Sequence, residues 1–356
     1  SWDIIWRSRG RISGDGWVVE LAIPLNQIRF PSGAEPQTWG FDLGRSYPRR
    51  LRHRIASNYR DRNVNCVLCQ VDKVSGFRGM RPGKNIELDP TLTATRKDEL
   101  DEFPNGALVE GDVEVEPGIT ARWSLTANQT LNAALNPDFS QVEADVAKLE
   151  ANERFALFFP EKRPFFLEGI DFFATPVNAI HTRTIRQPRW GAKYTAKQGR
   201  NAFGFFAAED EAPPVALIPF NQLTGGFVPQ ERVATSVARY RRDVGPRSTV
   251  GVLYAGREGQ STDYHNRVGG LDGFFRIGDR NTVSFQYLRS DTLYPEGSVD
   301  PVWNQTTGES FDDDALLVEW DYNSRDWRAE VEFEDRGDRF RADAGFLPRV
   351  NLRQLN

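Results

Sequence analysis

Apolar and charged residues alternate with a period of two through long stretches of the chain after residue 106. Along residues 316–322 the apolar positions are Leu316, Val318, Trp320 and Tyr322, and acidic residues stand at Glu319 and Asp321. Along residues 327–334, Trp327, Ala329, Val331 and Phe333 alternate with Arg328, Glu330, Glu332 and Glu334. Successive side chains of a strand point to opposite faces, and the turn-forming sequence NSRD separates the two segments. We therefore predict a hairpin with one apolar and one charged face.

The same period recurs at residues 250–254 and 283–287, so the sequence predicts several hairpins in series. In a soluble sandwich or propeller the apolar face would cover a core. In an outer-membrane barrel it would face lipid, and the charged face would line a lumen. The density of charge on the polar face favours the barrel. Aromatic residues near the expected strand ends fit the interface girdles of barrels, and equally an ordinary core: Trp190, Tyr194, Tyr240, Tyr254, Tyr287, Trp320 and Trp327.

Composition divides the chain into three regions. Residues 1–45 contain an alternating segment around Trp17 and Leu21 and a second expected strand at residues 39–43, which we interpret as the last strands of a β-sandwich. Residues 46–105 are rich in arginine, glycine and proline, which is typical of a structured connector. Residues 106–356 form the predicted barrel region, with an insert at residues 136–173.

That insert interrupts the alternation with a helix start, prolines and many phenylalanines. Ser140 and Glu143 fit a capping box, and Pro160 ends the short helix that they begin. The residues that follow are too aromatic for water and too charged for a plain core. We therefore predict a plug or gate that packs against a partly polar wall, built from Asp138, Phe139, Glu143, Asp145, Phe159, Glu161, Arg163, Phe165, Phe166 and Glu168.

The acids of the insert also support a competing hypothesis of glycoside hydrolysis, which uses two carboxylates about 5 to 9.5 Å apart. Buried acids otherwise need basic partners, here Arg154, Lys162 and Arg163, and we favour this structural role. The chain has no nucleophile elbow, P-loop or dinucleotide-binding motif, and its three histidines lack metal-ligand spacing. We therefore expect no catalytic residue, no cofactor and no metal site.

Cys66 and Cys69 form a CxxC motif without a second such pair. From sequence a disulfide, two free thiols and a metal or redox site are all alternatives. We predict a disulfide that closes a small loop, which would place the protein in the cell envelope or outside the cell.

The formal net charge of -5 argues against nucleic acid as the main partner, because binding to phosphates needs a basic excess. The arginines between Arg45 and Arg62 would attract anionic lipid or glycan groups, or would be neutralised by Asp42, Asp61 and Asp72. Four tryptophans are candidates for stacking on sugar rings, with core packing as the alternative: Trp2, Trp6, Trp17 and Trp39.

Several passages resemble a widespread family of bacterial outer-membrane β-barrel proteins of undefined function. They are NPDFSQVEAD, FFPEKRPFFLEG, IHTRTIRQPRWGAKYTAKQG and FRADAGFLPR. Members of that family carry, before the barrel, a sandwich similar to the family 9 carbohydrate-binding module, and WDIIWRSRGRISGDGWVVELAIPLNQIRF with WGFDLGR resembles its end. Since the family's sandwich begins before Ser1 and its barrel continues beyond Asn356, the resemblance implies an internal portion whose sheet has an unpaired edge.

These observations lead to a functional hypothesis. We expect a non-enzymatic protein of the bacterial outer membrane, with its sandwich outside the cytoplasm, that acts in uptake, export or envelope assembly. Its expected partners are outer-membrane lipid, a glycan or lipopolysaccharide, and other envelope chains, but not nucleic acid. The alternatives are a secreted carbohydrate-active β protein and a structural subunit of a larger envelope complex.

Overall fold

The structure is a computed structural model that describes residues 6–25, 28, 30, 36–49, 51–64, 66–80, 86–96, 98–101, 106–137, 155–211, 216–227, 229, 231–296 and 308–356. Strands dominate these residues and confirm the predicted all-β class. The helical elements are short, namely α1 (Pro164–Leu167), η2 (Leu68–Gln70), η3 (Ile170–Phe172) and η4 (Thr182–Thr184). In the described part, no helix has the length and apolar character needed to cross a membrane.

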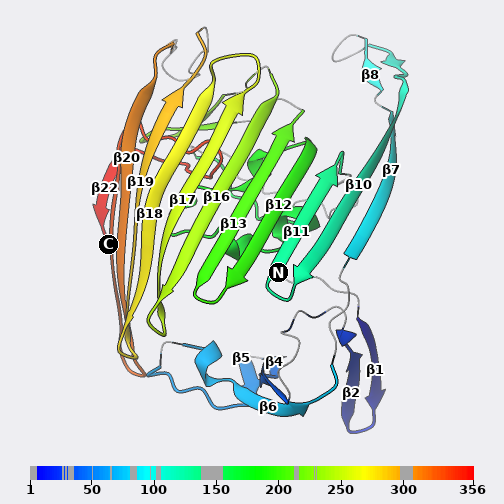
Figure 1. Ribbon diagram of the computed structural model, residues 1–356, viewed down its shortest axis with the longest axis vertical. Coiled ribbons are helices and arrows are strands. Elements are labelled where there is room, and N and C mark those ends of the chain that lie inside the picture. Colours follow the sequence, from blue (N-terminus) through cyan, green and yellow to red (C-terminus); the bar gives the residue numbers. More distant parts are fainter. Residues whose placement is uncertain are drawn as a thin grey trace.

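Twelve of the described strands form one antiparallel sheet in the order β22-β21-β20-β19-β18-β17-β16-β13-β12-β11-β10-β7 (Figure 1). Its first strands are β7 (Ile86–Arg96), β10 (Val113–Thr126), β11 (Gln129–Leu135), β12 (Pro188–Gln198) and β13 (Asn201–Asp210). They continue into β16 (Val233–Val244), β17 (Ser248–Gly259), β18 (His265–Ile277), β19 (Asn281–Leu293), β20 (Phe311–Asn323), β21 (Arg328–Arg336) and β22 (Leu352–Leu355). Most neighbours in the sheet are also neighbours in sequence, as in the predicted meander.

The predicted hairpin at residues 316–334 is formed by β20 and β21. Its register pairs Tyr322 with Ala329 and Trp320 with Val331, so the apolar residues of both strands share one face. Glu319 lies opposite Glu332 on the other face. The alternation in the sequence therefore fixes the register, because a slip by one residue would place charged side chains among the apolar ones.

The two faces of the large sheet differ in polarity, with the apolar face exposed and the polar face buried. Its outer face carries exposed apolar side chains on successive strands, including Leu131, Phe205, Val252, Leu271, Tyr287, Trp320 and Val331. Its inner face carries buried polar and charged side chains, including Lys193, Arg239, Arg257, Asn266, Asp272, Gln286 and Glu334. On β18 the neighbours Leu271 and Asp272 are 48% and 7% exposed. The charged face is therefore the buried one.

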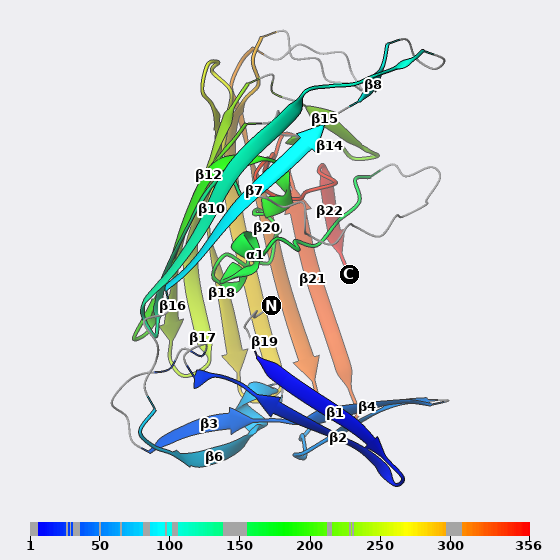
Figure 2. The same ribbon diagram turned by 90° about the vertical axis from the view of Figure 1, so that its right-hand side faces the viewer.

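The sheet curves around internal segments that lie against its concave side (Figure 2). These segments are residues 155–187, which include residues 155–173 of the predicted insert and continue to β12; a small hairpin of β14 (Ala216–Pro219) and β15 (Thr224–Phe227); and residues 337–351 between β21 and β22. The curved sheet is open in the described part, since β7 and β22 stand at its two ends and no described pairing joins them. The helix expected from Ser140 lies outside the described residues.

Small two-stranded sheets that precede the large one in sequence lie beyond its lower end in Figures 1 and 2. Their pairs are β1 (Arg7–Ser13) with β2 (Gly16–Ala22), β3 (Gln37–Phe41) with β6 (Asp72–Phe77), and β4 (Gly44–Arg49) with β5 (Leu51–Ala56). The pair of β8 (Glu99–Leu100) and β9 (Leu108–Val109) lies between β7 and β10 in sequence and at the upper end of the sheet. β3 thus pairs across the boundary expected at residue 45, and β7 joins the large sheet before its expected start at residue 106. Pro90 stands in the middle of β7, and a proline inside an alternating segment argues against a strand when only the sequence is known.

Candidate functional site

The best-defined candidate site is the interface between the inner face of the sheet and two internal segments. We call residues 155–187 the insert segment and residues 337–351 the return loop. Buried apolar side chains from both segments and from the sheet form one core, which includes Phe165, Phe166, Phe173, Phe206, Leu288, Leu317, Phe340 and Leu347. Since the core lies inside the curve, it attaches both segments to the sheet wall.

Arg163 holds the insert segment in its own fold. Its Nε and Nη2 donate to the two carboxylate oxygens of Glu161 at 2.8 and 2.6 Å. The guanidinium also donates to the carbonyl oxygens of Ile185 and Thr182, both at 2.8 Å, and lies 4.1 Å from the centre of the Phe166 ring. A buried bidentate ion pair whose remaining donors are also used is strongly orienting. Arg163 therefore ties the start of the segment to its end.

The same pair sets the charge state of this part of the segment. Burial acts to raise the pKa of Glu161, but the hydrogen bonds and positive charge of Arg163, with a further bond from Thr182, lower it below its ordinary value. Burial lowers the pKa of His181 to about 4, although Glu161 opposes this shift. At neutral pH the site thus holds an ionised Glu161 and a neutral His181.

Lysine, arginine and glycine residues of the sheet receive the insert segment. Lys193 of β12 donates to the carbonyl oxygens of Phe165 and Glu168, and Arg122 of β10 lies 3.0 Å from the Glu168 carboxylate. Phe173 packs directly over Gly204 of β13, where an added Cβ would lie 2.9 Å from the ring. The close approach of that ring therefore requires glycine in the wall.

The return loop is anchored through Asp343, which is 1% exposed. Its carboxylate accepts hydrogen bonds from the hydroxyls of Tyr264 at 2.7 Å and Tyr294 at 3.1 Å. Its backbone N–H donates to the Asn266 side chain at 2.8 Å, and Arg257 donates to its carbonyl oxygen at 2.9 Å. Burial raises the pKa of Asp343, while the positive charge of Arg257 and the two tyrosine hydroxyls act to lower it.

The two internal segments also contact each other. The backbone N–H of His181 donates to the carbonyl oxygen of Ala344 at 2.7 Å, and that of Phe346 donates to the carbonyl oxygen of Asn178 at 2.8 Å. The rings of Phe158 and His181 lie 5.2 and 5.5 Å from that of Phe346. Displacing one segment would therefore expose apolar surface on the other.

Beside these segments the inner face continues as a polar wall. Arg239 of β16 and Asp272 of β18 form a buried ion pair at 2.7 Å. Gln286 of β19 accepts a hydrogen bond from the backbone N–H of Val177 in the insert segment at 2.6 Å. The buried charge of Arg239 is thus balanced by Asp272, as burial requires.

Of the predicted plug residues, the described ones gather at this site. Phe165, Phe166 and Arg163 are buried, and Phe159, Glu161 and Glu168 are partly buried. Asp138, Phe139, Glu143, Asp145 and Arg154 lie outside the described residues. The sequence interpretation missed the return loop, because its own alternation of Phe340, Ala342 and Ala344 with charged residues resembles another strand.

The remaining candidates lie in the small sheets. Cys66 and Cys69 form the predicted disulfide, with a Cα–Cα distance of 5.4 Å. Trp6 and Trp17 are exposed, whereas Trp39 packs between Phe30 and Phe77, with ring centres at 5.9 and 5.0 Å, and Trp2 lies outside the described residues. Asp42 pairs with Arg60 and lies 3.9 Å from Arg54. Arg52 and Arg54 line an open pocket with Gly44 and Ser46.

The acidic side chains of the site take part in attaching the two segments. The carboxylates of Glu161, Glu168 and Asp343 are each engaged by arginine or tyrosine side chains. Among the described residues no group of three or more His, Cys, Asp or Glu side chains is placed to hold a metal ion. What the geometry supports is a polar wall that holds two segments across its concave side.

Comparison with protein families gives one match, in which residues 100–197 match Domain of unknown function (DUF5916). The matched stretch contains β10, β11, the insert and β12. The match covers well under half of the chain and includes the insert together with the wall strands before and after it. No curated protein and no solved structure matches the chain.

Proposed function

We propose that this chain is a non-enzymatic protein of the bacterial outer membrane whose curved sheet forms a lipid-facing wall around a partly filled lumen. The observation that carries the proposal is the polarity of the sheet, with exposed apolar residues outside and buried charges inside. A soluble protein rarely exposes so extended an apolar surface. Transmembrane strands alternate in this sense, with apolar residues towards lipid and polar residues towards the lumen.

The internal segments give this wall its role. The insert segment and the return loop lie on the concave side and are held by the anchors at Arg163, Lys193 and Asp343. We infer that they restrict passage through the lumen, in uptake or export, and that other envelope chains or further strands pair with β7 and β22. The resemblance to outer-membrane barrel proteins of undefined function points to the same setting.

The experiment is to express the full chain and to compare its migration on detergent gels before and after heating, together with its extraction from membranes. Insertion into a bilayer should give heat-modifiable migration and require detergent for extraction. A water-soluble, monodisperse monomer in the absence of detergent would contradict the proposal. Deleting the return loop should then increase ion conductance in planar bilayers if that loop restricts passage.

Glycan binding by the small sheets is a second candidate function. Trp6 and Trp17 are 49% and 54% exposed, and the Arg45 guanidinium lies 5.1 Å from the centre of the Trp17 ring. Exposed aromatic rings beside a cation are suited to stacking on sugars that carry acidic groups. Binding of acidic oligosaccharides should be lost in Trp17→Ala and kept in Trp39→Phe, whose ring belongs to the small core.

A further inference from the structure

The two ends of the large sheet differ in how the strands are connected. At one end, five turns join successive strands within a few residues, at residues 127–128, 199–200, 245–247, 278–280 and 324–327. Gly199, Gly245 and Gly278 adopt positive φ angles of 57°, 64° and 66° in three of these turns. At the other end the connections include β14 and β15, the long segment between β19 and β20, and the return loop. We call the first end the short-turn end.

Four of these five turns carry one arginine each, and these arginines are all exposed: Arg200, Arg247, Arg280 and Arg325. Arg247 is neutralised by Asp279 at 2.6 Å, and Arg325 lies 4.0 Å from Asp326. Arg200 and Arg280 have no carboxylate partner among the described residues. The short-turn end therefore presents positive charge that no carboxylate of the described residues balances.

Arg242, on the outer face of β16, adds a third such charge. Its Nη1 contacts only the amide oxygen of Asn201 at 3.4 Å, and no described carboxylate lies within ion-pair distance. Arg280 likewise contacts the hydroxyl of Tyr322 at 3.4 Å. A guanidinium with free donors is suited to bidentate contacts with phosphate oxygens.

Aromatic residues with polar tips border these arginines on the outer face. The Tyr240 hydroxyl donates to Asn201 at 2.7 Å, and the Trp320 indole donates to Asn281 at 3.1 Å. In both cases the partner is the first residue after a short turn. Tyrosine and tryptophan oriented in this way are typical of the level of lipid headgroups. The aromatic residues thus place the neighbouring arginines at the phosphate level of a bilayer.

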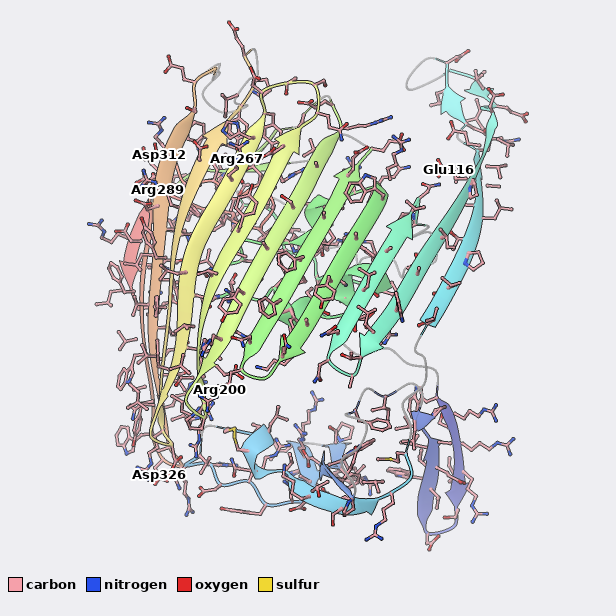
Figure 3. The ribbon with its side chains drawn as sticks, viewed as in Figure 1. Glu116, Arg200, Arg267, Arg289, Asp312 and Asp326 are labelled. Carbon is pink, nitrogen blue, oxygen red and sulfur yellow. A yellow bond between two sulfur atoms is a disulfide. The ribbon has the colours of Figure 1, made fainter. Side chains whose placement is uncertain are left out.

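The opposite end of the outer face is charged but internally balanced. Arg267 lies 2.8 Å from Glu258, and Arg289 bonds to both Asp312 and Asp314. Figure 3 shows Arg267, Arg289 and Asp312 at the upper end of the sheet, and Arg200 near the tips of the short turns. Arg267 and Arg289 are thus both paired with carboxylates, unlike Arg200, Arg242 and Arg280 at the short-turn end.

We propose that the short-turn end binds the phosphate groups of anionic phospholipids in one leaflet, through Arg200, Arg242 and Arg280. This inference rests on the proposed function, because it requires the outer face to lie in a bilayer. Basic residues close to an anionic membrane surface each strengthen binding about fivefold, so three should contribute on the order of a hundredfold. The contribution should weaken as salt is added.

The test uses insertion of the detergent-purified full chain into vesicles of phosphatidylcholine alone or mixed with phosphatidylglycerol. The parent protein should prefer the anionic vesicles. The triple variant Arg200→Gln, Arg242→Gln, Arg280→Gln should lose that preference, on the order of a hundredfold. The triple variant Arg200→Lys, Arg242→Lys, Arg280→Lys should keep most of it.

The matched control is Arg232→Gln, Arg267→Gln, Arg289→Gln, which removes the same net charge from the other end. It should keep the preference, and an equal loss in both glutamine triples would overturn the proposal. Equal insertion of the parent into both vesicles would also overturn it while leaving the proposed function intact. Failure to insert into either vesicle would instead contradict the proposed function. Equal competition by a soluble nucleic acid would assign the arginines to a different partner and reject the lipid.

Discussion

The outer and inner faces of the large sheet are made by the same strands, yet they follow opposite rules. On β18, the Leu271 side chain is exposed, whereas that of the next residue, Asp272, is buried and pairs with Arg239. In a water-soluble sheet these burial states would be reversed. The solvent around a β protein is therefore indicated by the direction of its apolar face and not by its content of apolar residues.

Removing one buried charge from the inner face should have the largest effect on stability. Asp272→Leu leaves Arg239 buried without its partner, which should destabilise the fold by about 3 to 5 kcal/mol. Equilibrium unfolding by urea in detergent measures the loss. The control is Asp291→Leu, which should have little effect because the exposed Asp291 carboxylate lies on the outer face beside partly buried His265. Similar losses in the two variants would mean that the inner face is not a closed low-dielectric environment.

A charge introduced on the outer face tests whether that face contacts hydrocarbon. Leu271→Arg places a cation within the apolar outer surface, and a cost of about 2 to 4 kcal/mol is expected at mid-depth in a bilayer. The heat-modifiable fraction after folding into vesicles should fall, while Leu271→Phe should keep it. If Leu271→Arg instead inserted as well as the parent, the outer face would not be in contact with hydrocarbon.

The anchor of the return loop should respond to smaller changes. Tyr264→Phe removes the 2.7 Å hydrogen bond to buried Asp343, and the expected cost is about 1 to 3 kcal/mol. Labelling of Ala344→Cys by a water-soluble maleimide should become faster, because the loop leaves the wall more often. Tyr287→Phe, which loses an exposed bond to Asp314, is the matched control. Unchanged labelling in Tyr264→Phe would exclude Asp343 as the anchor.

The free energy of unfolding should also depend on pH through His181, at the contact between the insert segment and the return loop. The pKa of His181 is lowered to about 4 from 6.5, so the folded state resists protonation of the ring. Stability from this group is complete above about pH 6.5 and is lost as the pH falls towards about 4, since the unfolded chain binds the proton first. His181→Phe keeps the ring contacts and should flatten the thermal-stability profile in that interval. A profile identical to that of the parent would assign the dependence to other groups.

Much of the wall could be predicted from sequence, because alternation, short turns and register are local properties. The hairpin of Leu316 and Val331 is an example, as is the disulfide of Cys66 and Cys69. The contacts of the segments on the concave side were harder to predict. Arg163 and Phe173 belong to a segment predicted to pack against the wall, but their actual partners, Ile185 and Gly204, depend on contacts between distant parts of the chain.

The return loop was missed for a related physical reason. A strand and an irregular segment can both alternate apolar and charged residues when each is buried between two unlike surfaces. Phe340 and Leu347 belong to the core, while Asp343 bonds to the wall. Only the tertiary structure distinguishes the two cases, since the difference lies in the partners of the backbone.

The return loop leaves β21 at Arg336 and enters the neighbouring strand β22 at Leu352, and these two residues are paired with each other. Both ends of the loop are therefore tethered side by side. Its opening is an intramolecular event that needs no change in the strands, and its recapture does not depend on protein concentration. Closing a short loop takes on the order of 10 to 100 ns for ten residues. The time that the loop spends open would then be set by how quickly Asp343 rebinds its partners. In the proposed function, a solute would have to enter during these brief, repeated openings.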